Sequence, residues 1–142
     1  IVPAGDGHAL WFADSVTQNL EKLHLEPGSS EIQGSEVVCK FENDLHPDGA
    51  CLDTDGNLWV AVIGSGEVRQ ISPTGDLLSS HASQISRPTM PMLGGLDGHS
   101  LFLTKQTRFL SADGLAAEPW AGGLLVKTVA AQGAPVNRVA GV

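Results

Sequence analysis

The sequence predicts an all-β fold, a β-propeller with about three four-stranded blades that form part of a larger ring. The first observation is that 17 glycines and 8 prolines in 142 residues separate short apolar runs, as turns separate strands. The second is a motif that starts at Asp6, Asp55 and Asp97: Asp-Gly, one or two residues, Leu, and a large aromatic side chain. Repeats spaced by about 40–50 residues are typical of propeller blades.

The first predicted blade covers residues 1–45 and contains the strands ALWFADS, NLEKLHL and SEVVCKF. A helix over residues 14–25 is the alternative, because Leu20 and Leu23 also fit helical spacing, but the repeat favours strands. We expect this blade to lack its innermost strand, since Ile1 lies only a few residues before the first hairpin.

The second predicted blade covers residues 46–86. Its strands ACLDT and LWVAVIG are joined by a tight Asp55-Gly56 turn, because glycine tolerates the positive φ that such turns require. EVRQIS alternates apolar and polar residues, and DLLSSHA is the expected outer strand. The third blade, residues 87–142, contains RPTMPMLGG, SLFLTKQ and GLLVKTVA, with a loop expected over residues 111–122.

The whole chain, 1–142, is expected to be a single domain that is incomplete on its own. Closed propellers have about 4–8 blades, and open blade edges expose unpaired backbone groups. We therefore expect a second polypeptide that carries the other blades, or a second copy of this chain. The absence of an initial methionine before Ile1 suggests a processed or truncated chain.

Charge and hydropathy exclude several classes of partner. The formal net charge is −8 and the basic residues are scattered, so no nucleic-acid partner is expected. No apolar stretch is long enough to cross a membrane, and no signal peptide is visible. These features predict a soluble protein of unknown location, in which Cys39 and Cys51 are expected as free thiols rather than as a disulfide.

Four segments together resemble the SMP-30/gluconolactonase family, which is also called regucalcin-like. They are LWFADS, PDGACLDTDGNLWVAVIGSGEVRQISPTGDLL, RPTMPMLGGLDGHSLFLT and GLLVKTVAAQGAP. The resemblance covers nearly the whole chain but only the C-terminal half of the family fold. It implies a six-bladed propeller whose axial tunnel holds a divalent cation, most often Ca²⁺, with Zn²⁺ or Mn²⁺ in some members. Many members hydrolyse lactones.

The resemblance implies that Asp48, in Pro47-Asp48-Gly49, is a metal ligand and a catalytic residue. The family's other ligands, a Glu and an Asn, would precede Ile1. Such a cation prefers oxygen ligands, polarises a carbonyl group and lowers the pKa of bound water. The alternative is that Pro-Asp-Gly forms a turn in which Asp48 binds backbone amides.

Three further residues are candidates for binding a lactone or ester substrate: His46, Arg87 and Thr89. Arg87 could also brace a loop, and His46 could be a solvated loop residue. Met90 and Leu93 stand where the family usually has a small polar residue and an aromatic residue, so the tunnel mouth is expected to be more apolar, and a bulkier substrate is plausible.

Other conspicuous side chains are expected to be structural. Asp14, Asp53 and Asp55 should brace turns, and His8 and His99 should lie in matching hairpin turns. No serine has a G-x-S-x-G context, so serine hydrolase chemistry is unsupported. The repeated aromatic side chains are expected in the blade cores: Trp11, Trp59 and Phe102.

The sequence therefore predicts half of a divalent-metal-dependent lactonase-type hydrolase, completed by another chain. Two alternatives remain open. One is a non-catalytic binding or scaffold propeller, and the other is a strictosidine synthase-like propeller enzyme that catalyses condensation. Fold analogy alone does not choose among them.

Overall fold

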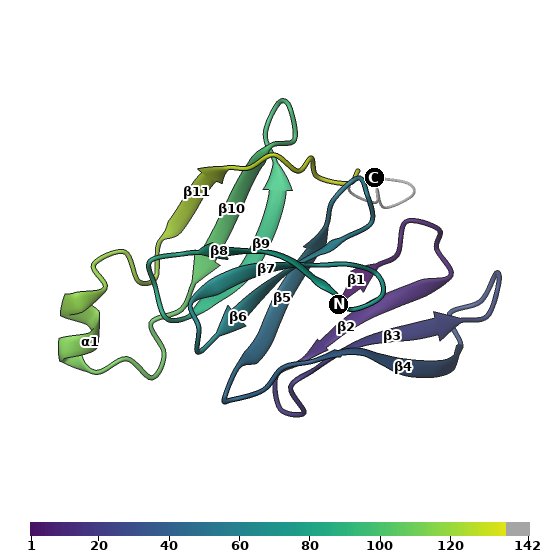
Figure 1. The fold of residues 1–142 in the computed structure, drawn as a ribbon, viewed down its shortest axis with the longest axis horizontal. Coiled ribbons are helices and arrows are strands. Elements are labelled where there is room, and N and C mark those ends of the chain that lie inside the picture. The colour runs from purple at the N-terminus through teal and green to yellow at the C-terminus, as the bar shows by residue number, and fades with distance from the viewer. Residues whose placement is uncertain (136–142) are drawn as a thin grey trace.

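The computed structural model describes residues 1–135, which form three antiparallel sheets arranged one after another in chain order (Figure 1). Sheet 1 has the order β1 (Val2–Pro3), β2 (Ala9–Asp14), β3 (Asn19–Leu25), β4 (Ile32–Lys40). Sheet 2 has the order β5 (His46–Leu52), β6 (Leu58–Ile63), β7 (Glu67–Ile71), β8 (Leu77–Ala82). Sheet 3 consists of β9 (Pro88–Gly94), β10 (Ser100–Lys105) and β11 (Leu124–Thr128).

The strands form where the period-two pattern and the turn residues predict them. In β10, Leu101, Leu103 and Lys105 are buried while the residues between them are more exposed. The turn between β5 and β6 has Gly56 at a φ of +81°, a conformation that strains any residue with a Cβ. The ambiguous segment after Asp14 forms the strand β3, which pairs with β2 from Asn19 to His24.

The structure corrects two details of the sequence-based expectation. Sheet 1 does have an innermost strand, because Val2 and Pro3 pair with Trp11 and Leu10. The stretch expected as a loop over residues 111–122 contains the short helix α1 (Ala112–Ala117). The side chain of Ser111 accepts a hydrogen bond from the Gly114 amide at 3.1 Å, which caps the helix N-terminus.

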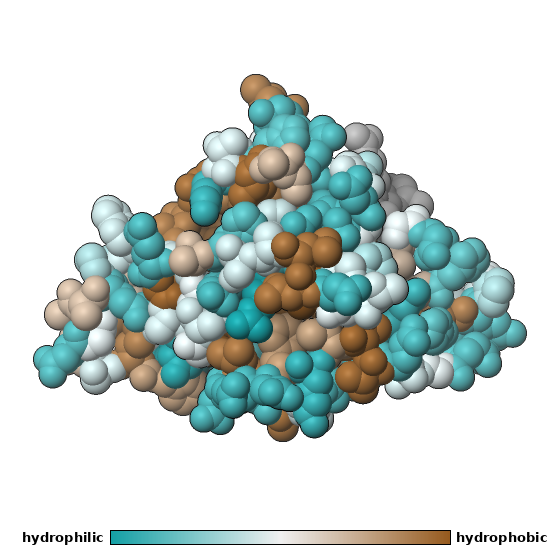
Figure 2. Space-filling view, in the orientation of Figure 1, coloured by the Kyte–Doolittle hydropathy of each residue, from teal (hydrophilic) through white to brown (hydrophobic). Residues whose placement is uncertain are grey.

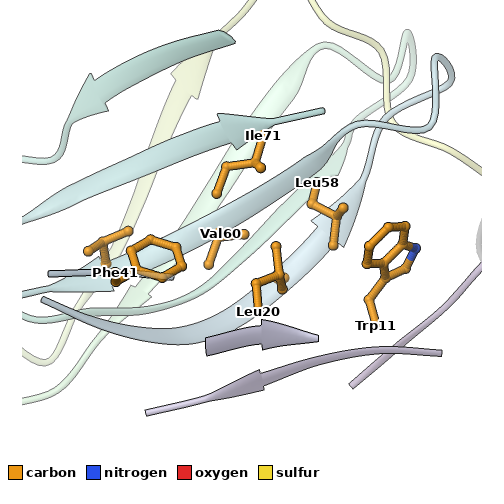
Figure 3. Packing of buried hydrophobic residues seen from close by; sticks show 8 residues of the cluster. Trp11, Leu20, Phe41, Leu58, Val60 and Ile71 are labelled. Carbon is orange, nitrogen blue, oxygen red and sulfur yellow. The ribbon is translucent and has the colours of Figure 1, made fainter. Parts of the chain in front are cut away.

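The core consists of two apolar layers, one between each pair of neighbouring sheets. In the first layer, Trp11 and Leu20 of sheet 1 pack against Leu58 and Val60 of sheet 2 (Figure 3). In the second layer, Trp59 of sheet 2 packs with Leu101 of sheet 3. Sheet 2 is covered on both faces, which explains why every residue of β6 except the last is buried.

A regular packing rule follows from these layers. The face of each sheet that carries the repeated tryptophan contacts the leucine-bearing face of the next sheet: Trp11 contacts sheet 2, and Trp59 contacts sheet 3. Phe102 lies at the same place in sheet 3, but no following sheet exists within residues 1–135. Phe102 is therefore only half-buried, and the expectation that it is a core residue is wrong for the described chain.

The innermost strands of the three sheets lie next to one another, with β5 in contact with both β1 and β9. The segment after β11 returns to sheet 2, where the Thr54 amide donates to the Gln132 carbonyl at 2.8 Å. Most of the surface toward the viewer is hydrophilic, with brown apolar patches near its middle (Figure 2). Among residues 1–135, no helix has the length and apolar character needed to span a membrane.

Candidate functional site

The four predicted site residues lie at the beginnings of the neighbouring inner strands β5 and β9. His46 and Asp48 belong to β5, Thr89 belongs to β9, and Arg87 directly precedes it. The two strands approach closely at Gly49, where an added Cβ would lie 2.5 Å from the Thr89 carbonyl oxygen. Glycine at this position therefore allows the inner strands to meet beside Asp48.

Asp48 has a carboxyl group without a hydrogen-bond partner in the described part of the chain. The side chain is half-buried, and it forms no hydrogen bond or salt bridge with residues 1–135. Burial raises the pKa of Asp48 above its ordinary value, although the positive charge of the N-terminal ammonium acts to lower it. A carboxylate that has lost water without gaining a donor is stabilised by a cation, so Asp48 is suited to act as an oxygen ligand.

The backbone around Asp48 is shaped by its neighbours. The β5–β6 pairing is irregular between Pro47 and Ala50, so Asp48 lies in a β-bulge. Bulges redirect side chains and are common next to functional sites. The Pro47 carbonyl accepts a hydrogen bond from Ser15 Oγ at 2.6 Å, which attaches the start of β5 to the β2–β3 turn of sheet 1.

His46 is held by the same turn. Its Nδ1 lies 2.7 Å from the Ser15 carbonyl oxygen, and a carbonyl oxygen can only accept a hydrogen bond. Nδ1 therefore carries the hydrogen, and in the neutral ring the Nε2 lone pair is available. His46 is half-buried and oriented by this bond, in contrast to a freely solvated loop histidine.

A pocket of about 510 Å³ brings His46 and Arg87 together. It lies where the β4–β5, β6–β7, β8–β9 and β10–α1 connections meet. Asp48 and Thr89 are not in its wall, but each follows a lining residue by two positions along an extended segment. The lining residues are Asp44, His46, Ile63, Gly64, Ser86, Arg87, Phe109 and Leu110.

Arg87 and Thr89 have different surroundings. The guanidinium carbon of Arg87 lies 5.4 Å from the centre of the Phe109 ring, a cation–π arrangement. The Thr89 hydroxyl is 2.8 Å from the Thr104 hydroxyl, and the Thr104 oxygen also accepts from the Met90 amide at 3.1 Å. The Thr89 hydroxyl is thus already engaged with β10.

A second, apolar pocket of about 330 Å³ lies further along the inner strands, and Met90 and Leu93 line it together with residues of β1 and β5. Leu93 is 3% exposed and belongs to the second core layer, whereas Met90 is 42% exposed. The two residues expected to make the tunnel mouth apolar do line one apolar space, and of these two Met90 is the one open to solvent.

Three contributors to the site were not predicted from the sequence: Ser15, Arg108 and Phe109. Ser15 orients His46 and Pro47 through its backbone and side chain. Phe109 is 72% exposed and carries the guanidinium groups of both Arg87 and Arg108. An Arg-Phe pair in a loop is a weak sequence signal, because nothing in the chain indicates that it lies beside Arg87.

The described residues do not form a complete metal site. Within residues 1–135, no group of three or more His, Cys, Asp or Glu side chains is placed to hold a metal ion. A metal ion bound by Asp48 would therefore need further ligands, such as backbone carbonyl oxygens, water or groups from outside these residues.

The fold and the arrangement of the inner strands define a β-propeller-type protein, with sheets that pack face to face as successive blades. The sequence profile of the SMP-30/gluconolactonase/LRE-like region matches residues 4–107. The chain belongs to this family.

Curated relatives with similar sequences are regucalcins. The chain is 30% identical to pig (Sus scrofa) regucalcin over 121 residues, which cover 84% of this chain and 40% of the relative. It is 33% identical to zebrafish (Danio rerio) regucalcin over 119 residues, which cover 82% of this chain and 40% of the relative. The chain thus spans less than half the length of these relatives.

Solved structures confirm the predicted propeller fold. A calcium-binding protein, regucalcin, from Agrobacterium tumefaciens superposes with a TM-score of 0.87 at 24% identity, covering 98% of this chain and 48% of that one. A luciferin-regenerating enzyme superposes with a TM-score of 0.77 at 22% identity, covering 93% of this chain and 45% of that one. At these identities the likeness concerns the fold.

Proposed function

We propose that the chain forms half of a divalent-metal-dependent lactonase-type hydrolase, with Asp48 as one of its metal ligands. The observation that carries the proposal is the Asp48 carboxylate, half-buried without a partner among residues 1–135 on an innermost strand. Family membership supports the reaction class, because the family includes gluconolactonases. Ca²⁺ is the preferred cation, since a carboxylate is a hard oxygen ligand. Zn²⁺ or Mn²⁺ are alternatives.

The chemistry divides between the cation and the chain. A bound divalent cation supplies polarisation of the lactone carbonyl and a lowered pKa for its water. The Asp48 carboxylate would bind the cation as one of its ligands, and it can accept a proton from the attacking water. His46 and Arg87 line the adjoining pocket, and their proposed role is to bind the substrate there.

The remaining ligands are proposed to come from blades outside the described residues. Such blades belong to a second polypeptide or to a second copy of this chain. A metal of the Ca²⁺ type requires about 6–8 oxygen ligands, and Asp48 supplies at most two. The open face of sheet 3 and the relatives, of which the chain covers less than half, support the presence of further blades.

The experiment is an Asp48→Asn substitution in the assembled protein. Asparagine keeps the shape of the side chain but removes the charge, so we expect loss of most bound calcium and a fall of about 100-fold or more in lactone hydrolysis. Metal content is measured by plasma emission spectrometry, and turnover is measured with δ-gluconolactone by following acid release.

Asp97→Asn is the matched control, because Asp97 is an exposed hairpin aspartate whose carboxylate accepts from the His99 amide. The control should keep both the metal and the turnover. If Asp48→Asn retains them equally well, Asp48 is not the ligand and the proposed function is wrong.

A further inference from the structure

We propose that the substrate of this site carries an anionic group, a carboxylate or a phosphate, which Arg87 binds in the pocket at the start of β5 and β9. This inference rests on the proposed lactonase function and specifies the class of lactone that the site accepts. In this proposal Arg87 selects the substrate. Phe109 and Arg108 are positioning residues, which hold the Arg87 guanidinium in place through the Phe109 ring.

The first step of the argument is the geometry of the arginine pair. The guanidinium carbons of Arg87 and Arg108 lie 5.4 Å and 4.6 Å from the centre of the same Phe109 ring. The two cations are therefore no further apart than the sum of these distances. A ring that carries two guanidinium groups holds them in place while their in-plane N–H donors stay free for a ligand.

The second step is that this positive charge is not neutralised. The described residues contain two ion pairs, His24–Glu36 and Arg69–Glu67, and neither involves Arg87 or Arg108. Asp44 is the one acidic residue among those lining the pocket, and it forms no salt bridge with Arg87. In a chain with a formal net charge of −8, two arginines beside one ring that form no salt bridge within residues 1–135 are a local exception, and one of them, Arg87, lines the pocket.

The third step concerns the rest of the pocket wall. Ser86 Oγ is buried and has no hydrogen-bond partner within residues 1–135, although Ser86 lines the pocket next to Arg87. Buried hydroxyl groups usually have a partner. A hydroxyl and a guanidinium at one pocket are donors that suit the oxygens of a carboxylate or phosphate.

The pocket also lies close to Asp48 along the strand β5. His46 lies in its wall, and Asp48 follows two residues later on the same strand. A substrate anchored by its anionic group at Arg87 would therefore extend toward the carboxylate proposed to hold the cation. Charge-assisted contacts of this kind change affinity by roughly 10-fold to 100-fold.

The test compares three lactones with the assembled protein: neutral δ-gluconolactone, the carboxylate-bearing 5-oxotetrahydrofuran-2-carboxylate, and 6-phosphoglucono-δ-lactone. We expect a lower KM for an anionic lactone than for the neutral one, and the better of the two anionic lactones identifies the group. Arg87→Gln should raise that KM about tenfold or more, and it should raise the KM for δ-gluconolactone by a smaller factor.

Two further variants sharpen the result. Phe109→Ala removes the shared ring and should raise the KM for the anionic lactone in the same direction by a smaller factor. Arg69→Gln is the matched control, because Arg69 also faces an aromatic ring, that of Phe41, but it is paired with Glu67. It should leave the preference for anionic lactones unchanged. An Arg87→Gln variant that treats all three lactones as the wild type does would overturn the inference.

A binding measurement separates this inference from the proposed function. If no lactone is hydrolysed, the proposed function fails, and calorimetric titration with 6-phosphogluconate and with inorganic phosphate still decides the inference. Binding by the wild type that Arg87→Gln weakens about tenfold supports anion recognition. Absence of binding by the wild type, or equal binding by both proteins, contradicts it.

Discussion

Gly49 is the residue at which the two inner strands beside the proposed metal ligand come closest together. A Cβ at this position would lie 2.5 Å from the Thr89 carbonyl oxygen and 2.9 Å from the Met90 Cα, and it would also meet the Met90 sulfur. The side chain of Met90 can move, but the backbone of β9 can do so only by shifting the strand. The close approach of β5 and β9 beside Asp48 therefore requires a residue without a Cβ at position 49.

Gly49→Ala is expected to destabilise the protein by about 1–3 kcal/mol, because overpacking forces the backbone of β9 away from β5. The free energy of unfolding is measured by denaturant titration. Gly34→Ala is the control, since Gly34 also lies in a strand, β4, and a Cβ there would have no atom within 4 Å. Equal stability of the two variants would show that the close approach at Gly49 is unimportant.

At the scale of elements, the β5–β6 hairpin is organised by the buried carboxylate of Asp53, which is 2% exposed. Its two oxygens accept hydrogen bonds from the Trp59 indole at 3.0 Å, the Gln70 amide at 2.9 Å and the Asn57 backbone amide at 2.8 Å. Burial acts to raise the pKa of Asp53, but these donors outweigh it and lower the pKa below its ordinary value. The expected structural role of Asp53 is therefore confirmed.

Asp53→Asn is expected to lower the free energy of unfolding by about 3 kcal/mol at pH 7, because the amide cannot accept from all of these donors. The pKa of Asp53 is lower in the folded state, so its stabilisation is present above the unfolded pKa of about 4 and is lost as the pH falls below it. The variant should lose less stability than the wild type between about pH 5 and pH 2, as measured by thermal unfolding at each pH.

Asp55→Asn provides the comparison, because Asp55 is exposed in the same hairpin. It should follow the wild type at every pH. Identical pH profiles for Asp53→Asn and Asp55→Asn would contradict the role assigned to the buried carboxylate.

The other elements of the site depend on contacts between sheets. The β2–β3 turn is braced by Asp14, whose carboxylate accepts from the Val16 amide at 2.8 Å, and Ser15 of the same turn binds both His46 and Pro47. Sheet 1 thus sets the tautomer of a histidine in sheet 2. Matching turns at His8 and His99, where the amides donate to Asp6 and Asp97, confirm that the hairpins repeat.

At the scale of the whole molecule, the outer face of sheet 3 is apolar and uncovered within residues 1–135. The strand register aligns Met92, Phe102 and Val126 in one row across the sheet, with Met90 and Leu124 in the next. Leu124 and Val126 are 59% and 58% exposed. Because the equivalent faces of the other two sheets are covered, this face is the expected contact for a further blade.

Val126→Glu tests this contact. The wild-type chain, of 14.8 kDa, is expected to associate or to bind a hydrophobic dye when isolated, and a charge at the β11 end of the apolar row should reduce both effects. Light scattering after gel filtration gives the mass, and dye fluorescence gives the exposed apolar surface. Val16→Glu is the control, since Val16 is 90% exposed in the β2–β3 turn. A wild-type chain that remains a monomer without dye binding would contradict the prediction.

The repeat also accounts for the success of the fold prediction. Asp-Gly turns and alternating strands are local signals, readable within a few residues, so the order of the strands and the family could be predicted from the sequence. The short β1 and α1 were missed for the same reason. A two-residue strand exists only because β2 lies beside it, and a six-residue helix has too little periodicity to be recognised.

What the chain determined by itself is the succession of strands, the structural role of Asp53 in its hairpin, and the choice of Asp48 as the candidate ligand, whose role as a ligand stays a prediction. What only the tertiary structure decided is which side chains meet. Phe109 reaches Arg87 from a different connection, and Ser15 reaches His46 from a different sheet. Local sequence specifies local backbone geometry, but the contacts that tune a site join segments far apart in the chain, and packing of the sheets decides those contacts.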